Sequence, residues 1–187
     1  MNSWLKQAKT GLLVLLLFFS APLSAHQTGN SYLVVTDANG RLHIDIDFIV
    51  RDLDSLLQNT AQASTQSPSS TPTPEQLKAK QAAITQIIQE SLVVEVNEQA
   101  QSLDFIEQSV VLHNDGLYVR QRFSGPSIPA PVRFVVVRYG FFNQNDKLGR
   151  AFFKLQLGQE EISSVFDSSK ETQRFALGES KRWATMG

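Results

Sequence analysis

The chain has 187 residues, with 17 Lys and Arg against 18 Asp and Glu, and it has no cysteine. The lack of cysteine excludes thiol catalysis, thiolate metal sites, disulfides and a lipid anchor attached to cysteine. The nearly balanced charge argues against a basic nucleic-acid-binding surface, so we expect no nucleic-acid partner.

The first 25 residues predict a secretory signal peptide. Lys6 and Lys9 form a basic start, an apolar run covers residues 12–19, and small residues lead to Ala25. This order is typical of a cleavable leader, and the apolar run is shorter than the roughly 20 residues that span a membrane. We expect a mature chain that begins at His26 and works in the periplasm or at the extracytoplasmic face of the membrane. A retained, poorly inserted anchor is the alternative.

The next elements predict a β-hairpin. Residues 32–35 and 42–50 are predicted strands, and the segment between them contains Asn39-Gly40, a strong signal for a tight turn. In the second strand the even positions are apolar, whereas His43, Asp45 and Asp47 alternate along the other face. We therefore expect a sheet that packs on one side and faces solvent on the other.

A polar insertion and one helix follow the hairpin. Residues 58–74 are rich in Gln, Ser, Thr and Pro, a composition typical of a disordered segment. Thr73 is suited to cap a helix that has Pro74 in its first position and Gln76 three residues after the cap. Apolar residues then recur at helical spacing, and we expect one helix over residues 75–91.

The second half of the chain predicts short strands in pairs. We expect hairpins between residues 92–96 and 102–106, between 109–113 and 117–123, and between 151–157 and 161–167. Residues 132–139 are the most apolar run and predict a central strand, and residues 173–177 predict a short edge strand.

Together these elements predict a mainly β fold. We expect an antiparallel, Ig-like β-sandwich with one inserted α-helix. A single domain is expected over residues 26–180, followed by a C-terminal tail over residues 181–187.

Several short motifs carry a family resemblance. They are Ala25-His26, Ser31-Tyr32-Leu33, Arg51-Asp52-Leu53-Asp54, Tyr139-Gly140-Phe141-Phe142, Val165-Phe166 and Gln173-Arg174-Phe175. With these motifs the chain resembles the extracytoplasmic N-terminal region of the long-form HupE/UreJ family of membrane proteins. The resemblance implies a membrane portion, associated with nickel or cobalt handling, after this region. Either an ectodomain of a longer protein or a stand-alone relative fits it. Family members often carry a calcium-loop-like stretch where this chain has its polar insertion, so no calcium role is implied.

Two sets of residues are candidate ligands for a divalent transition metal. Cleavage after Ala25 would leave the α-amine and the imidazole of His26 on one residue, and these nitrogens can chelate copper, nickel or zinc. His43, Asp45 and Asp47 could offer one nitrogen and two carboxylates from one strand face. The alternatives are an incidental histidine at a poorly ordered terminus and a solvated sheet face.

The chain lacks the sequence motifs of esterases, zinc proteases, P-loop proteins and dinucleotide-binding domains. We therefore expect a non-enzymatic extracytoplasmic domain that acts with a membrane protein or permease, and the family resemblance implies metal-ion uptake. Three alternatives stay open. They are a periplasmic metal-binding protein that uses His26, an adhesion or assembly module, and a hydrolase whose catalytic residues converge from distant positions.

Overall fold

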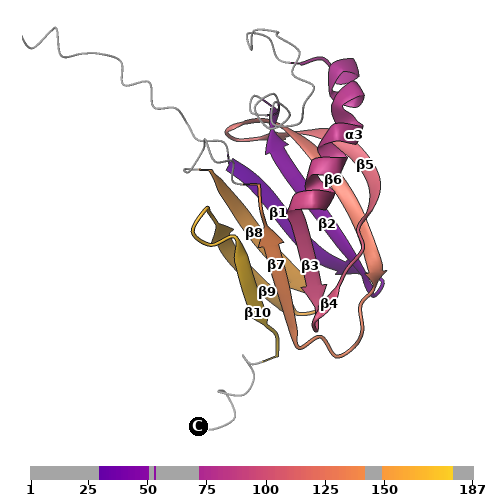
Figure 1. Cartoon of the computed structure of the whole chain (residues 1–187), viewed down its shortest axis with the longest axis vertical. Coiled ribbons are helices and arrows are strands. Elements are labelled where there is room, and N and C mark those ends of the chain that lie inside the picture. Colours follow the sequence, from indigo (N-terminus) through magenta and orange to yellow (C-terminus); the bar gives the residue numbers. More distant parts are fainter. Residues whose placement is uncertain (1–29, 51–52, 54–71, 142–148, 179–187) are drawn as a thin grey trace, which may run out of the picture.

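The computed structural model of the chain describes residues 30–50, 53, 72–141 and 149–178 (Figure 1). The predicted signal peptide, His26, most of the 58–74 insertion and the 181–187 tail lie outside the described residues. The described elements are β1 (Asn30–Ala38), β2 (Arg41–Ile49), α3 (Pro74–Ser91), β3 (Leu92–Val96), β4 (Gln99–Ala100), β5 (Asp104–His113), β6 (Gly116–Ser127), β7 (Phe134–Tyr139), β8 (Arg150–Leu157), β9 (Glu160–Phe166) and β10 (Thr172–Ala176).

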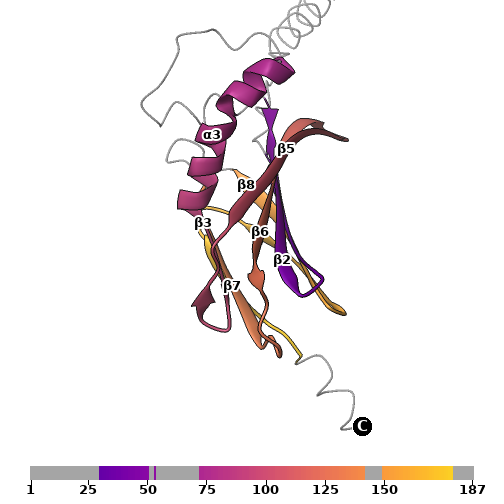
Figure 2. The ribbon, with the colours of Figure 1, turned by 90° about the vertical axis from the view of Figure 1, so that its right-hand side faces the viewer.

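The strands form two packed sheets. One sheet has six strands in the order β5-β6-β2-β1-β8-β9, and the other has four in the order β10-β7-β3-β4. Figure 2 shows α3 continuing the layer of β3 and β7, opposite β2, β5 and β6 of the six-stranded sheet. The prediction of a β-sandwich with one inserted helix is therefore confirmed. So is the central position of the 132–139 run, because β7 lies between β10 and β3.

The helix begins at the cap that the sequence predicts. The Thr73 side chain accepts a hydrogen bond from the Gln76 backbone, and the Gln76 side chain accepts one from the Thr73 backbone, which is a complete capping box. Four apolar residues of α3 are buried on one face: Leu77, Ile84, Ile87 and Ile88. The helix ends at Ser91, and β3 begins at the next residue. The buried face of α3 packs on the part of the six-stranded sheet that the second sheet does not cover (Figure 2).

The core lies between the two layers. Along β2 the even positions from 42 to 48 are buried against it, as their alternation predicts. An aromatic cluster joins the sheets: the Phe153 ring stacks on Phe175 with centroids 4.7 Å apart and meets Phe166 edge-on at 5.4 Å. A buried hydrogen bond of 2.6 Å between Ser31 Oγ and Tyr139 Oη also connects them.

Two strand pairings differ from the predictions. β3 pairs with the short β4 rather than with residues 102–106, because Asn97 and Glu98 both adopt positive φ and close a tight turn without glycine. Residues 104–113 then form one continuous strand in the other sheet. In addition, β1 and β8 pair in parallel. Local sequence patterns do not predict this pairing, because the two strands are far apart in the chain.

Candidate functional site

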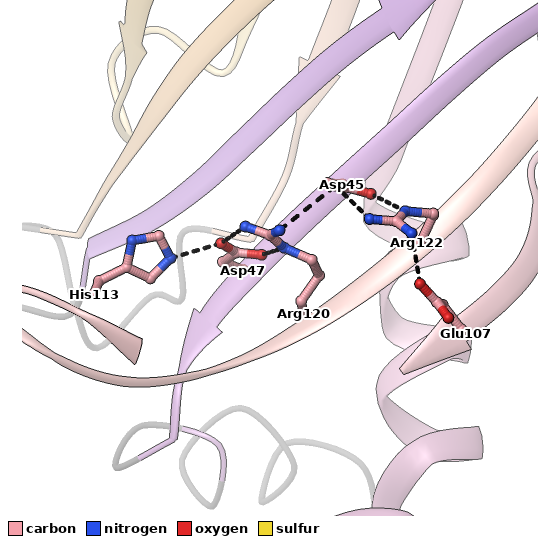
Figure 3. Close-up of polar contacts among 6 residues, drawn as sticks. All are labelled: Asp45, Asp47, Glu107, His113, Arg120 and Arg122. Carbon is pink, nitrogen blue, oxygen red and sulfur yellow. Dashed lines mark hydrogen bonds and ion pairs between the residues drawn. The ribbon is translucent and has the colours of Figure 1, made fainter. Parts of the chain in front are cut away.

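The outer face of the six-stranded sheet carries a ladder of opposite charges. Strand register sets Asp45 opposite Arg122 and Asp47 opposite Arg120 across β2 and β6. It also sets Glu107 of β5 opposite Arg122. Because side chains alternate along a strand, all these charged groups lie on the face that points away from the core. We call the set of Asp45, Asp47, Glu107, His113, Arg120 and Arg122 the charge ladder (Figure 3).

The contacts within the charge ladder are short and partly bidentate. Arg120 donates from Nε to Asp47 Oδ1 at 2.7 Å and from Nη2 to Oδ2 at 2.8 Å. Arg122 holds Asp45 in the same way at 2.8 and 3.2 Å, and its Nη1 donates to Glu107 at 2.6 Å. Paired donors that match a planar carboxylate make such contacts stronger and more directional than single hydrogen bonds. The ladder therefore ties β5, β6 and β2 together in register.

Asp47 is the most deeply buried charge of the ladder. Its side chain is 3% exposed, and its two oxygens accept from Arg120 and from His113, whose Nε2 lies 2.7 Å from Oδ2. The hydrogen bond to Asp47 raises the pKa of Arg120 above its ordinary value, and the hydrogen bond to Asp45 does the same for Arg122. A buried carboxylate depends on such partners, because an unpaired charge in this position is costly.

Aromatic rings hold His113 at the end of the ladder. Its ring stacks on Tyr32 with centroids 4.6 Å apart and meets Tyr118 edge-on at 4.6 Å. Gly116 stands opposite His113 in the register with a φ of 154°, where a side chain would be strained. The imidazole is therefore a packed structural member of the outer face, and its position at the end of β5 agrees with the strand-end location expected from the sequence.

The predicted metal ligands on β2 form ion pairs and strand contacts in the structure. Asp45 and Asp47 do share one face, but their carboxylates are bound by arginine. The register places His43 opposite Thr36 and Ser124. Among the residues that the structure describes, no three His, Cys, Asp or Glu side chains gather in a way that could hold a metal ion. In this structure guanidinium groups occupy the carboxylates of Asp45 and Asp47, so a metal site of His43, Asp45 and Asp47 stays a prediction.

Other candidate residues from the sequence have different outcomes. His26 lies outside the described residues, so its chelate stays a prediction. The partners Arg120 and Arg122 were not predicted as site residues, although their spacing in the sequence indicates the pairing. Arg-x-Arg on β6 repeats the two-residue spacing of Asp-x-Asp on β2, and two such strands in one sheet are able to pair their charges.

The free edge at β5 carries exposed apolar side chains. Ile106 is 47% exposed, Val110 44% and Leu112 81%. β5 is the last strand of its sheet, and within the described ranges no strand pairs with its outer edge. A bulge between Phe105 and Glu107 interrupts the pairing with β6, so the regular part of the edge runs from 107 to 113. Unpaired backbone groups beside exposed apolar side chains are a template for pairing with another chain.

The opposite edge of the same sheet is built differently. Gln173 of β10 donates from Nε2 to the Val165 carbonyl of β9 at 2.8 Å, and Ser164 donates to the Gln173 side chain at 2.6 Å. These bonds occupy polar groups of the β9 edge from within the same chain. The β5 edge is therefore the better candidate for an interaction surface.

Comparisons with known proteins add no family to this description. Neither the family models nor the curated proteins that were searched contain a match to the chain. None of the described helices is both long and apolar enough to cross a membrane.

Proposed function

We propose that this chain is an exported, non-enzymatic domain that binds a membrane-associated protein through the β5 edge. The observation that carries the proposal is the exposure of Ile106, Val110 and Leu112 on an edge strand whose outer side pairs with no described strand. Soluble proteins usually protect long apolar edges, so an edge left open in this way favours a role in binding.

The compartment and the kind of partner come from the sequence. The basic, apolar and small-residue segments of residues 1–25 support export. The resemblance to the extracytoplasmic region of HupE/UreJ proteins supports a partner in the membrane and a role in nickel, cobalt or other metal-ion uptake. Both parts of the proposal are open to direct test.

The charge ladder supports a binding role by fixing the geometry of the edge. Arg122 links Glu107 on β5 to Asp45 on β2. At the other end of β5, its last residue, His113, forms a hydrogen bond with Asp47 of β2. These bonds hold β5 to its neighbours at both ends of its regular stretch. A recognition strand gains affinity when it is held in the bound conformation beforehand, because less ordering is required on binding.

Position-specific photo-crosslinking in cells tests the proposal. The full gene is expressed with p-benzoylphenylalanine in place of Leu112, and a matched variant carries it in place of Val165, an exposed apolar residue on β9. After irradiation, we expect a crosslinked adduct in the membrane fraction for position 112 and none for position 165. Adducts at neither position, or equal adducts at both, would contradict a binding role for β5. An unprocessed chain in the cytoplasm would contradict export.

A further inference from the structure

We infer that β5 binds its partner by strand addition, and that the bound segment is an extended strand with apolar side chains at alternate positions and a basic residue opposite Glu107. This inference rests on the proposed function and specifies the chemistry of the partner. In strand addition, backbone hydrogen bonds provide affinity and the alternating side chains provide specificity.

The apolar part of the inference follows from side-chain alternation along β5. Val110 and Leu112 are two residues apart, so they lie on the same face of the strand, and the register pairs them with Val119 and Leu117 of β6. Both are exposed, and they lie on the face of the sheet that also carries Val119. A strand added at this edge places every second side chain beside them, within contact distance. Its residues opposite Val110 and Leu112 are therefore apolar.

The charged part follows from the sign pattern across the sheet. Asp45, Arg122 and Glu107 occupy neighbouring positions on β2, β6 and β5, so negative, positive and negative charges alternate across the strands. The next position in this row belongs to the added strand. Glu107 binds Arg122 on its inner side at 2.6 Å, but its side chain is 51% exposed and lies on the last strand, next to the added position. A lysine or arginine there continues the alternation, whereas an acidic residue meets a like charge.

A second copy of β5 fits this surface poorly. In antiparallel self-pairing, matching Val110 with Leu112 of the second copy sets Glu107 against Asp115 of that copy, which are like charges. Shifting the register so that Glu107 faces His113 sets Leu112 against Gln108. In this second register Val110 faces Val110 of the other copy, but Leu112 stays opposite a polar side chain. Neither register satisfies all the apolar and charged positions together, so the surface fits a different, basic strand better.

The probe is a capped heptapeptide, Arg-Val-Thr-Val-Thr-Val-Arg, whose pattern reads the same in both strand directions. Two control peptides carry Glu in place of both Arg, or Pro in place of the central Val. Protein recovered from the envelope after export is titrated with each peptide, and binding is followed by fluorescence anisotropy and by amide chemical shifts. We expect the Glu peptide to bind at least about fivefold more weakly and the Pro peptide about tenfold more weakly, with shifts centred on residues 107–113.

Three variants separate strand addition from other modes of binding. Leu112→Lys should weaken the Arg peptide by about tenfold, because lysine on an edge strand opposes pairing. Val165→Lys on β9 should leave its affinity unchanged. Glu107→Lys should reverse the preference, so that the Glu peptide binds more tightly than the Arg peptide.

Each contrary result has a defined meaning. Strand addition is overturned if no peptide binds, if the Pro peptide binds as tightly as the Arg peptide, or if the shifts map away from β5. A dimer in sedimentation that Leu112→Lys dissociates would assign the edge to a second copy instead. Crosslinks at position 112 without peptide binding would leave the proposed function intact and remove only the strand-addition mode.

Discussion

The two edge strands of the six-stranded sheet, β9 and β5, differ in how far other parts of the chain cover them. At β9, Gln173 and Ser164 close the gap to the second sheet with hydrogen bonds, and Phe166 packs behind them among the core aromatics. At β5, a single bulge interrupts an otherwise regular strand, and Val110 and Leu112 stand exposed. The second sheet therefore occupies part of the β9 edge, whereas Val110 and Leu112 of β5 stay exposed. We interpret the closed edge as structural and the open edge as functional.

The largest expected effect separates the edges by stability. Phe166 is fully buried, so Phe166→Ala should lower the free energy of unfolding by about 3–5 kcal/mol. Leu112→Ala should change it by no more than about 0.5 kcal/mol, because the side chain already contacts water. Urea unfolding of both variants checks the contrast. A loss at Leu112 comparable with that at Phe166 would show that the β5 side chains are packed in solution.

Within the charge ladder, loss of the buried carboxylate should lower stability more than loss of the exposed one. Asp47→Asn leaves Arg120 and His113 without their buried carboxylate and should cost about 2–4 kcal/mol. Glu107→Gln, at the exposed end, should cost less than about 1 kcal/mol. Thermal and urea unfolding compare the two variants. Equal losses would mean that the ladder is not anchored at Asp47.

Alkaline pH should lower the free energy of unfolding, because Tyr139 is buried between the two sheets. Burial raises the pKa of Tyr139 well above its ordinary value of 10.0, although its hydrogen bond with Ser31 partly opposes the shift. The folded state therefore keeps this proton longer than the unfolded state, and stability is lost as the pH rises above 10.0. The loss from this group approaches about 1.4 kcal/mol per pH unit.

Tyr139→Phe is the matched control for the pH effect. It removes the ionising hydroxyl and its bond to Ser31, so it should cost about 1 kcal/mol at neutral pH. Above the ordinary tyrosine pKa it should lose stability less steeply than the unmodified protein, in urea unfolding measured between pH 8 and pH 11. Parallel slopes for the two proteins would contradict the account of Tyr139.

Removing the hydrogen bonds that protect the β9 edge should have a smaller effect than the losses at Phe166 and Asp47. Gln173→Ala frees the Val165 carbonyl and the Ser164 hydroxyl, and it should cost about 1 kcal/mol. By exposing polar groups of a second edge it should also increase self-association, which sedimentation velocity measures. No change in either property would mean that Gln173 does not protect β9.

Local patterns predicted the parts of the fold that local physics decides. The Thr73 capping box, the buried face of α3 and the alternation of β2 are all present as expected. The parallel pairing of β1 with β8 and the true extent of β5 were not predicted, because they depend on contacts between segments far apart in the chain. The same holds for the candidate site. Asp45 and Asp47 were recognised as sharing a face, but their arginine partners are set by the register between β2 and β6.

Hydrogen exchange of the backbone amides tests the central claim most directly. Protein recovered from the envelope is measured alone and with the Arg-Val-Thr-Val-Thr-Val-Arg peptide at saturation. A strand added to the edge provides acceptors for the backbone N–H groups that point outward. Every second amide within residues 107–113 should therefore gain protection, while the amides of β9 stay unchanged. Unchanged exchange in β5 with the peptide bound, or new protection confined to β9, would contradict the account.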